Sequence, residues 1–529
     1  MDLKFDIVKR NRFKTAIKNF LLLTVFLIPG PFLSAQNQRS QKPNIIVFLV
    51  DDMGWQDTSV PFWTKVTDLN RKYHTPNMER LAREGMKFTN AYAMPVCTPT
   101  RVSLMTGVNA AHHRVTHWTS PNQNTNTDYA DTTLNFVDWN INGFSPVAGV
   151  PHTFYGTPLP AVLSKNGYYT VHAGKAHFGS AGTSGSNPVN VGFQVNIAGN
   201  EIGHPASYLG KNNYDKPVNG KPSRNAVPGL EKYHGTDVFL SDAITTEALK
   251  ALEKPISEKN PFFLYLAHYA VHVPLDADKR FTDKYLKAGL DSTEAKYAAL
   301  IEGMDKSLGD VLKFLDDKKV ADNTVLIFMS DNGGLSTTPA RGGKAWTHNL
   351  PLKAGKGSVY EGGIREPMLV RWPGVVKPQT VSEQYLIVED FFPTILDIAG
   401  IKSPTLVQQI DGKSFLPLLK NPSLTDNERE LVWHHPNRWI PSEGPIIHFS
   451  SAFRKGDWKL IYDYRKSKLE LYNLKNDIGE LNDVAVSNPE KVKQLAGLFT
   501  AQLKKWDAQL PVFKKTGKQV AWPDEIAAK

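Results

Sequence analysis

Uninterrupted apolar runs separated by amphipathic stretches predict a β-sheet packed between layers of helices. The run at 44–50 reads NIIVFLV, which suits a central strand buried on both faces. Comparable runs follow at 168–173, 261–267 and 324–329, and the large apolar side chains of 300–315 fall on one helical face. Strands that alternate with helices are typical of an α/β fold with a mostly parallel central sheet.

The pattern changes towards the C-terminal end. Short strand-like runs at 446–453, 458–464 and 469–474 are separated by turns, and a helical stretch ends the chain. This pattern predicts a small antiparallel sheet with a helix. The sequence therefore divides into an N-terminal segment at 1–35, a main α/β domain at 36–425 and a C-terminal α+β subdomain at 426–529.

The N-terminal segment resembles a secretory signal peptide. Six Lys and Arg residues precede the apolar run at 20–28, and the small residues Ser34 and Ala35 follow it. The apolar run is shorter than the roughly 20 residues that span a bilayer. We expect cleavage after Ala35, export to the periplasm or the medium, and no membrane span in the mature chain; a retained N-terminal anchor is the alternative.

Charge and cysteine content narrow the function classes. The formal charge is +10 over 529 residues, and the first 35 residues carry six basic and two acidic residues, so the mature chain keeps about +6. Its basic residues are scattered, without the basic blocks of nucleic-acid binders, and a modest positive charge suits an anionic substrate. Cys97 is the single cysteine, so no intrachain disulfide can form. The residue is then either a buried apolar side chain or a group that takes part in a reaction.

Polar side chains follow the predicted parallel strands where each strand ends. Open α/β sheets bind their ligands at this edge. The acidic and amide residues offer only oxygen ligands, which favours Ca²⁺ or Mg²⁺ over zinc. Taken singly, each pair also fits a helix cap or a turn. The residues concerned are Asp51 and Asp52, then Lys175 and His177, then His272, and last Asp331 and Asn332.

The stretch Cys97-Thr98-Pro99-Thr100-Arg101 predicts a helix that starts at the cysteine. Pro99 suits a first turn, and Cys97 would lie at the positive end of the helix dipole with Arg101 one turn below. Cys-x-Pro-x-Arg resembles the modification motif of type I, formylglycine-dependent sulfatases, which share the alkaline-phosphatase-like fold. Thr100 departs from the serine or alanine that is more frequent in that family, which leaves open which maturation enzyme acts.

Further blocks resemble the same family, in family order, over about residues 42–480. They are Asp51-Asp52-Met53-Gly54, Gly174-Lys175-Ala176-His177, His272-Val273-Pro274, Ser330-Asp331-Asn332-Gly333-Gly334, Gly355-Lys356-Gly357-Ser358 and Gly456-Asp457-Trp458-Lys459-Leu460. The resemblance implies that a formylglycine-generating enzyme oxidises Cys97. It also implies a cation, Ca²⁺ rather than Mg²⁺, held by Asp51, Asp52, Asp331 and Asn332 together with an oxygen of modified Cys97.

The resemblance also implies catalytic roles. One hydroxyl of the formylglycine hydrate attacks sulfur, and His177 takes the proton of the other hydroxyl so that sulfate leaves and the aldehyde re-forms. His272 protonates the departing alcohol, a step that sugar alkoxides need more than phenolates do. Arg101, Lys175 and Lys356 orient the hydrate and hold the sulfate oxygens.

The expected substrate is a sulfated polysaccharide or oligosaccharide; ulvan, galactans and glycosaminoglycans all remain open. Loops at 107–160, 178–235 and 345–349 are expected to rim the pocket. Two alternatives stay open: a phosphate or phosphonate ester hydrolase of the same superfamily, and a non-catalytic relative that binds sulfated glycan. Weaker candidates for substrate contact are His348, His434, His435 and Arg438.

Overall fold

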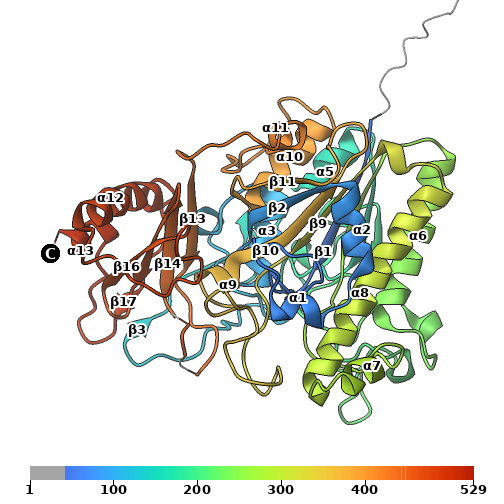
Figure 1. The fold of residues 1–529 in the computed structure, drawn as a ribbon, viewed down its shortest axis with the longest axis horizontal. Coiled ribbons are helices and arrows are strands. Elements are labelled where there is room, and N and C mark those ends of the chain that lie inside the picture. Colours follow the sequence, from blue (N-terminus) through green and yellow to red (C-terminus); the bar gives the residue numbers. More distant parts are fainter. Residues whose placement is uncertain (1–41, 443, 447, 529) are drawn as a thin grey trace, which may run out of the picture. The chain divides into compact units, whose positions relative to one another are not determined.

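A computed structural model describes residues 42–528 except 443 and 447 (Figure 1). The proposed signal peptide at 1–35 lies outside the described residues. The centre of the described part is a nine-stranded sheet in the order β11-β2-β10-β9-β1-β8-β6-β7, with β12 beside β2. The mostly parallel α/β fold predicted from the apolar runs is confirmed.

Four of the predicted strands form a parallel block at the centre of this sheet. β1 pairs with β8 on one side and β9 on the other, and β6 extends the block beyond β8. The strands are completely or almost completely buried because helices cover both faces. Their bounds are β1 (Asn44–Val50), β6 (Tyr169–Gly174), β8 (Phe262–Ala267) and β9 (Thr324–Ser330).

The sheet continues beyond β9 with strands that the sequence did not reveal. β10 runs antiparallel to both β9 and β2, whereas β11 and β12 run parallel to β2. At the opposite end of the sheet, β7 (Val195–Ile197) pairs with β6 and was not predicted either. The bounds of the strands beyond β9 are β2 (Met86–Tyr92), β10 (Arg365–Arg371), β11 (Thr380–Ser382) and β12 (Leu386–Ile387).

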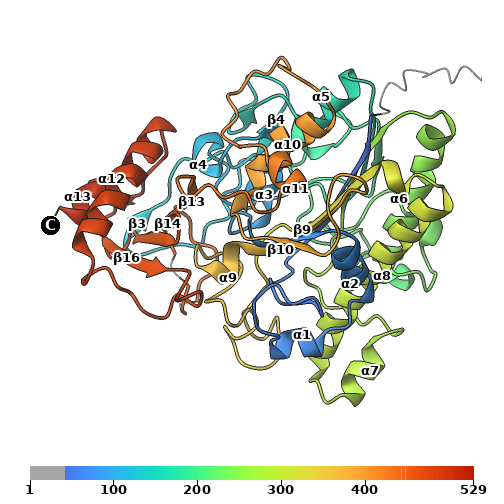
Figure 2. The same ribbon diagram turned by 45° about the horizontal axis from the view of Figure 1, so that its top comes forward.

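Alternate residues of β1 enter two separate cores. Ile45, Val47 and Leu49 pack with one set of helices, and Ile46, Phe48 and Val50 pack with the other. Figure 2 shows the two helical layers on either side of the sheet. The first layer contains α3 (Cys97–Thr106), α5 (Leu159–Lys165), α10 (Phe391–Ile398) and α11 (Leu416–Lys420); the second contains α2 (Pro76–Glu84), α6 (Leu240–Ser257), α7 (Thr282–Lys287) and α8 (Ser292–Asp317).

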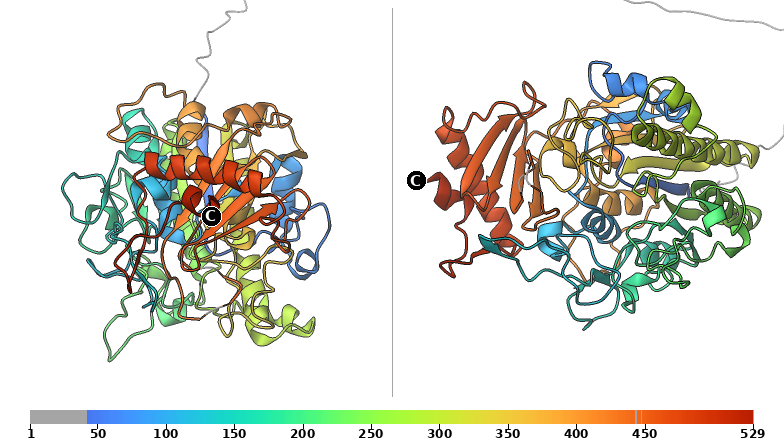
Figure 3. Two further views of the ribbon diagram at one scale, coloured as in Figure 1. Left: turned by 90° about the vertical axis from the view of Figure 1, so that its left-hand side faces the viewer. Right: turned by 90° about the horizontal axis from the view of Figure 1, so that it is seen from below.

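The C-terminal part contains the predicted antiparallel sheet with a helix, together with a fourth strand at 430–435 that the sequence did not predict. The strands β13 (Glu430–His435), β14 (Ser450–Lys455), β15 (Trp458–Asp463) and β16 (Lys468–Asn473) pair in chain order. Helix α12 (Pro489–Lys505) lies across one face, as Figure 3 shows, where Phe453 stacks on Phe499. On the other face, Trp433 and Ile461 belong to the same core as α3, so this sheet is anchored to the main α/β part.

Short elements complete the described chain. Much of the region between α3 and α6 is irregular, as its Asn, Gly, Ser and Thr content predicts. None of the helices in the described residues has the length and apolarity needed to cross a bilayer. The short elements are α1 (Asp68–Lys72), α4 (Ala110–His113), β3 (Leu134–Asn135), β4 (Phe144–Ser145), β5 (Phe154–Tyr155), α9 (Glu361–Ile364), β17 (Val512–Phe513) and α13 (Pro523–Ala527).

Candidate active site

The acidic residues that follow β1 and β9 meet at the edge of the sheet. These strands are parallel and in register up to Val50 and Ser330, so the residues after them emerge side by side. The Asp52 amide donates to Asp331 Oδ1 at 3.3 Å, and Asn332 Nδ2 donates to Asp52 Oδ1 at 2.7 Å. All of these side chains are buried.

A cationic side chain neutralises each of the three carboxylates. Lys175 Nζ lies 2.7 Å from Asp51 Oδ2, and Lys356 Nζ lies 2.6 Å from Asp52 Oδ1. Arg101 Nε and Nη2 donate to Asp331 Oδ2 at 2.9 and 2.7 Å, and its Nη1 donates to the carbonyl of Lys175 at 2.7 Å. Arg101 and Lys175 are completely buried, so both contact the acidic cluster from the protein interior.

Three oxygens of this cluster are buried without a hydrogen-bond donor in the described residues. They are Asp51 Oδ1, Asp52 Oδ2 and Asn332 Oδ1. Burial and the charge of Asp331 raise the pKa of Asp51 well above its usual value, a cost that a bound cation would offset. An oxygen-only donor set of this kind fits a hard divalent cation such as Ca²⁺ or Mg²⁺.

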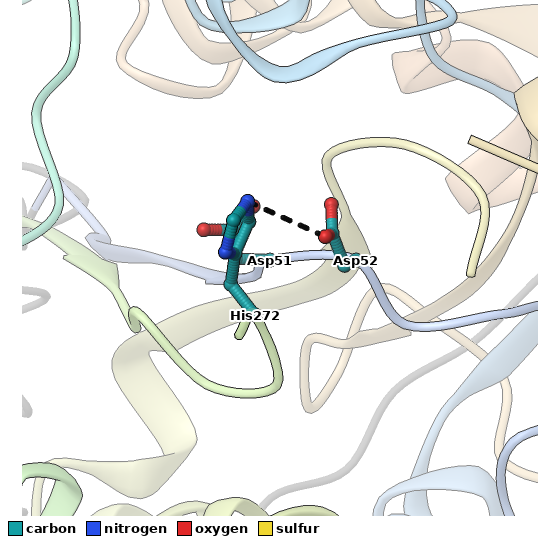
Figure 4. Close-up of side chains that lie close together, drawn as sticks. All are labelled: Asp51, Asp52 and His272. Atoms are coloured by element: carbon teal, nitrogen blue, oxygen red, sulfur yellow. Dashed lines mark ion pairs between the residues drawn. The ribbon is translucent and has the colours of Figure 1, made fainter. Parts of the chain in front are cut away.

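His272 also approaches the cluster. Donor atoms of Asp51, Asp52 and His272 all lie within 4.8 Å of one another (Figure 4). The Nε2 atom of His272 is 3.5 Å from Asp52 Oδ2, while its Nδ1 lies 2.9 Å from the carbonyl oxygen of Val273 and donates to it. Burial and the Lys356 ammonium lower the pKa of His272 well below its usual value, so the ring is neutral here.

Cys97 is the first residue of α3, as predicted. Every residue of α3 is buried, and Cys97 is 3% exposed. Its Sγ lies 3.4 Å from Nδ1 of His177. The thiol is therefore presented at the positive end of a buried helix, beside an imidazole.

The hydrogen bonds of His177 define its tautomer. Its Nε2 lies 2.9 Å from the carbonyl oxygen of Thr119, which can only accept, so Nε2 carries the proton. In the neutral ring the lone pair is then on Nδ1, which faces Cys97. Burial and the nearby Lys175 lower the pKa of His177 well below its usual value, which keeps this lone pair available.

A cavity of about 440 Å³ opens at this point. Five of the predicted site residues line it, whereas Asp51, Arg101, Lys175, Asp331 and Asn332 lie behind its wall. Residues from the loops 118–129 and 203–225 form part of the lining, as predicted for 107–160 and 178–235. The five are Asp52, Cys97, His177, His272 and Lys356.

Comparison with known families identifies the family to which this chain belongs. A family model described as Sulfatase matches residues 43–401, which is more than half of the chain. The chain belongs to the sulfatase family. A second model, described as N-sulphoglucosamine sulphohydrolase, C-terminal, matches residues 355–509. The protein is therefore a sulfuric ester hydrolase.

Individual relatives agree with the family match. A protein described as a sulfatase from Formosa agariphila is 29% identical over 97% of this chain and 99% of its own length. Human N-acetylgalactosamine-6-sulfatase is 32% identical over 73% of this chain and 67% of its own. Among solved structures, Ps i-CgsB in complex with k-i-k-neocarrahexaose is 25% identical with a TM-score of 0.66, covering 92% of this chain and 97% of that one.

The four weaker substrate-binding candidates do not line the cavity of the sulfatase. The structure therefore does not support direct substrate contact for any of them, nor for the stretch 345–349. The buried ring of His348 forms hydrogen bonds with the carbonyl of Gly342 and the hydroxyl of Ser336. The buried ring of His434 forms hydrogen bonds with the carbonyl of Gln509 and the hydroxyl of Ser451. His435 is buried against His117, and Arg438 pairs with Asp131.

Sequence reasoning missed four ring-bearing or charged residues that line the cavity of the sulfatase. Loop composition pointed to their segments but to no individual side chain among them. Trp439, the last residue of a stretch at 433–439 that combines rings with polar donors in the sequence, also lines the cavity. His204 stacks on His272 with the ring centres 5.5 Å apart and the planes at 5°. A Cβ on Gly357 would lie 2.2 Å from the Trp439 ring, so the ring packs directly on the backbone beside Lys356. The four missed residues are Trp118, Tyr129, His204 and Arg224.

Proposed function

We propose that this sulfatase removes sulfate groups from a sulfated oligosaccharide or polysaccharide, using formylglycine formed from Cys97 and a calcium ion. The observation that carries the proposal is the placement of Cys97. It lies at a helix N-terminus, 3.4 Å from a proton-accepting nitrogen of His177, on the cavity that Asp52 of the acidic cluster also lines. Glycan substrates are supported by the relatives, one of which is described as N-acetylgalactosamine-6-sulfatase.

The cation would be held by Asp51, Asp52, Asp331 and Asn332. Three donor-free buried oxygens support this assignment. When bound, a divalent cation stabilises negative charge on oxygens of the nucleophile and of the sulfate group. Arg101 and Lys175 pair with Asp331 and Asp51 and orient these carboxylates. Neither side chain lines the cavity, so we assign both a positioning role in place of the expected contact with the sulfate oxygens.

Two side chains in the cavity wall act on the sulfate and on residue 97. Lys356 reaches the cavity beside Asp52 and offers its remaining N–H groups to the sulfate oxygens. His177 accepts the proton of the second hydroxyl of residue 97 at Nδ1, because its Nε2–H is held by Thr119. Loss of that proton lets the carbon–oxygen bond to sulfate break and the aldehyde return.

His272 is placed to protonate the leaving alcohol. Its Nδ1–H is held by the carbonyl of Val273, so Nε2 is the nitrogen that exchanges a proton with the substrate. Because the resting ring is neutral, Nε2 first takes up a proton from solvent, beside the Asp52 carboxylate. The imidazolium then gives this proton to the strongly basic leaving oxygen of the sugar as the sulfur–oxygen bond breaks. Stacking on His204 fixes the plane of the ring for this transfer.

We also propose that the enzyme is exported, with residues 1–35 removed, and acts on glycan in the periplasm or outside the cell. The basic residues, apolar run and Ser34-Ala35 at the N-terminus support this location. Sequencing of the mature N-terminus and assay of cell fractions test it directly; an intact N-terminus in active enzyme would contradict it.

One experiment tests the central proposal. The protein is produced with a formylglycine-generating enzyme, the peptide containing residue 97 is analysed by mass spectrometry, and sulfate release is measured on a panel of sulfated sugars. We expect an aldehyde at residue 97 and sulfate release. Active enzyme that retains the thiol would refute the mechanism. Preference for phosphate or phosphonate esters, or glycan binding without turnover by the modified protein, would refute the substrate assignment.

A further inference from the structure

One charged side chain that lines the cavity has no counter-ion among the residues that the structure describes. Three charged residues line the cavity: Asp52, Lys356 and Arg224. Asp52 and Lys356 neutralise each other at 2.6 Å. Arg224 is exposed, and no described residue forms an ion pair or a hydrogen bond with its guanidinium group. The cavity therefore carries an unneutralised positive charge in addition to the groups that surround the scissile sulfate.

The backbone on both sides of Arg224 is fixed. Before it, the carboxylate of Asp215 accepts the amide of Ser223 at 3.0 Å. After it, the carbonyl of Asn225 accepts the amide of Ala206 at 2.8 Å. Arg224 is thus held at the cavity by a loop whose shape does not depend on the arginine itself.

The same loop is connected to the proposed general acid. The Nδ2 atom of Asn225 lies 3.1 Å from Nε2 of His204, and the ring of His204 stacks on His272. The position of Arg224 is therefore set relative to the nitrogen that meets the leaving oxygen. A group bound by Arg224 belongs to the part of the substrate near the scissile bond.

Aromatic rings complete this part of the cavity. Tyr129 is 45% exposed, and its amide donates to the carbonyl of Arg438 at 3.0 Å, which joins its loop to the segment that carries Trp439. Both rings line the cavity together with Trp118. Exposed aromatic faces stack on sugar rings, and a guanidinium group binds carboxylate or sulfate through two parallel hydrogen bonds.

We infer that Arg224 binds a second anionic group of the substrate, so that the enzyme prefers glycans with a carboxylate or another sulfate close to the sulfate it removes. The inference rests on the proposed glycan sulfatase function. The scissile sulfate is bound at the inner end of the cavity, by residue 97 and Lys356, which leaves Arg224 for a different anion. Carboxylate and sulfate each present two oxygen atoms that can accept the two parallel hydrogen bonds of a guanidinium group.

The test compares variants on matched substrates. Three sulfated disaccharides are used: one with no other charge, one with a uronic acid carboxylate and one with a second sulfate. Arg224→Ala should raise KM for at least one of the two doubly charged disaccharides about tenfold more than for the singly charged one, a difference of about 1.4 kcal/mol. Arg224→Lys should recover part of the loss, because it restores charge without the paired donors.

Lys221→Ala is the matched control, since Lys221 is exposed on the same loop but does not line the cavity. Equal effects of Arg224→Ala on all three disaccharides, or an effect of Lys221→Ala as large as that of Arg224→Ala, would overturn the inference and leave the sulfatase proposal intact. Failure of the modified wild-type enzyme to hydrolyse any sulfated sugar would overturn the proposed function itself. The disaccharide that responds identifies the second anion as carboxylate or sulfate.

Discussion

Gly203 lies against the imidazole that is proposed to accept the proton from residue 97. A Cβ at this position would lie 2.8 Å from Cε1 of His177, whereas ordinary contacts start at 3.4 Å. The ring or the loop must therefore move by about 0.6 Å in Gly203→Ala. His177 is held at Nε2 by Thr119, so the shift alters its distance to residue 97. Displacements approaching 1 Å cost up to roughly a hundredfold in rate, and we expect kcat to fall about ten- to hundredfold.

The assay for this variant is 4-nitrophenyl sulfate hydrolysis by enzyme whose formylglycine content has been measured. Gly497→Ala is the control, because a Cβ on this glycine of α12 meets nothing within 4 Å. We expect Gly203→Ala to lower kcat with a loss of stability of about 1–3 kcal/mol from overpacking. A Gly203→Ala enzyme with wild-type kcat would refute the argument that the position of His177 limits the reaction.

Four further predictions follow from the structure. Lys459→Met should lower the free energy of unfolding by about 3–5 kcal/mol, because it leaves the buried Glu361 and Glu480 without their shared ammonium. Lys468→Met, which removes an exposed ion pair with Asp483, should lower it by less than about 1 kcal/mol. Urea denaturation measures both. Burial raises the pKa of Glu389 to about 8, so the folded protein holds a proton that the unfolded chain releases above about pH 4.5. Stability should then fall by up to about 1.4 kcal/mol per pH unit between these values, and Glu389→Gln should abolish this slope. His272→Ala should reduce hydrolysis of sugar sulfates far more than hydrolysis of 4-nitrophenyl sulfate, because a phenolate leaves without a proton. Removal of the proposed calcium ion with EGTA should lower the thermal midpoint of unfolding, and calcium at 100 times its Kd should restore about 2.7 kcal/mol of stability.

Each of these predictions has a contradicting outcome. Equal losses of unfolding free energy in Lys459→Met and Lys468→Met would show that burial does not determine how much an ion pair stabilises the protein. A Glu389→Gln protein with the same pH slope would assign the slope to another group. Equal losses of His272→Ala on both substrates would remove the general-acid role, and a thermal midpoint that responds to magnesium but not to calcium would correct the identity of the cation.

The sequence predicted the centre of the sheet well because fully buried parallel strands read as continuous apolar runs. β1 and β9 are of this kind, and the polar residues after them met as expected. β10 was not predicted, since its sequence REPMLVR begins with two charged residues and a proline. Its Arg365 is stabilised by Glu361 and by the ring of Trp55, contacts that depend on the folded chain.

The residues proposed to act on sulfate were also easier to predict from the sequence than the other residues that line the cavity. Short motifs carry Cys97 and His177, so local sequence was sufficient to select them. His204 and Arg224 lie in an irregular loop, and only long-range contacts bring them to the cavity. The four candidates chosen in the C-terminal half were selected for their polar rings and side chains, yet the fold uses these groups for internal hydrogen bonds.

The packing of Trp439 on Gly357 has a consequence for how this enzyme can diversify. Residue 97 and its histidines come from the main α/β part, whereas Trp439 and Ile440 reach the cavity from the segment between β13 and β14. Sequence change in that segment alters the cavity surface offered to the proposed sugar substrate and leaves residue 97 and its histidines unchanged. One part of the cavity wall is thus encoded apart from the residues that act on the sulfate group, and exchange of that segment between relatives is a direct route to altered substrate preference.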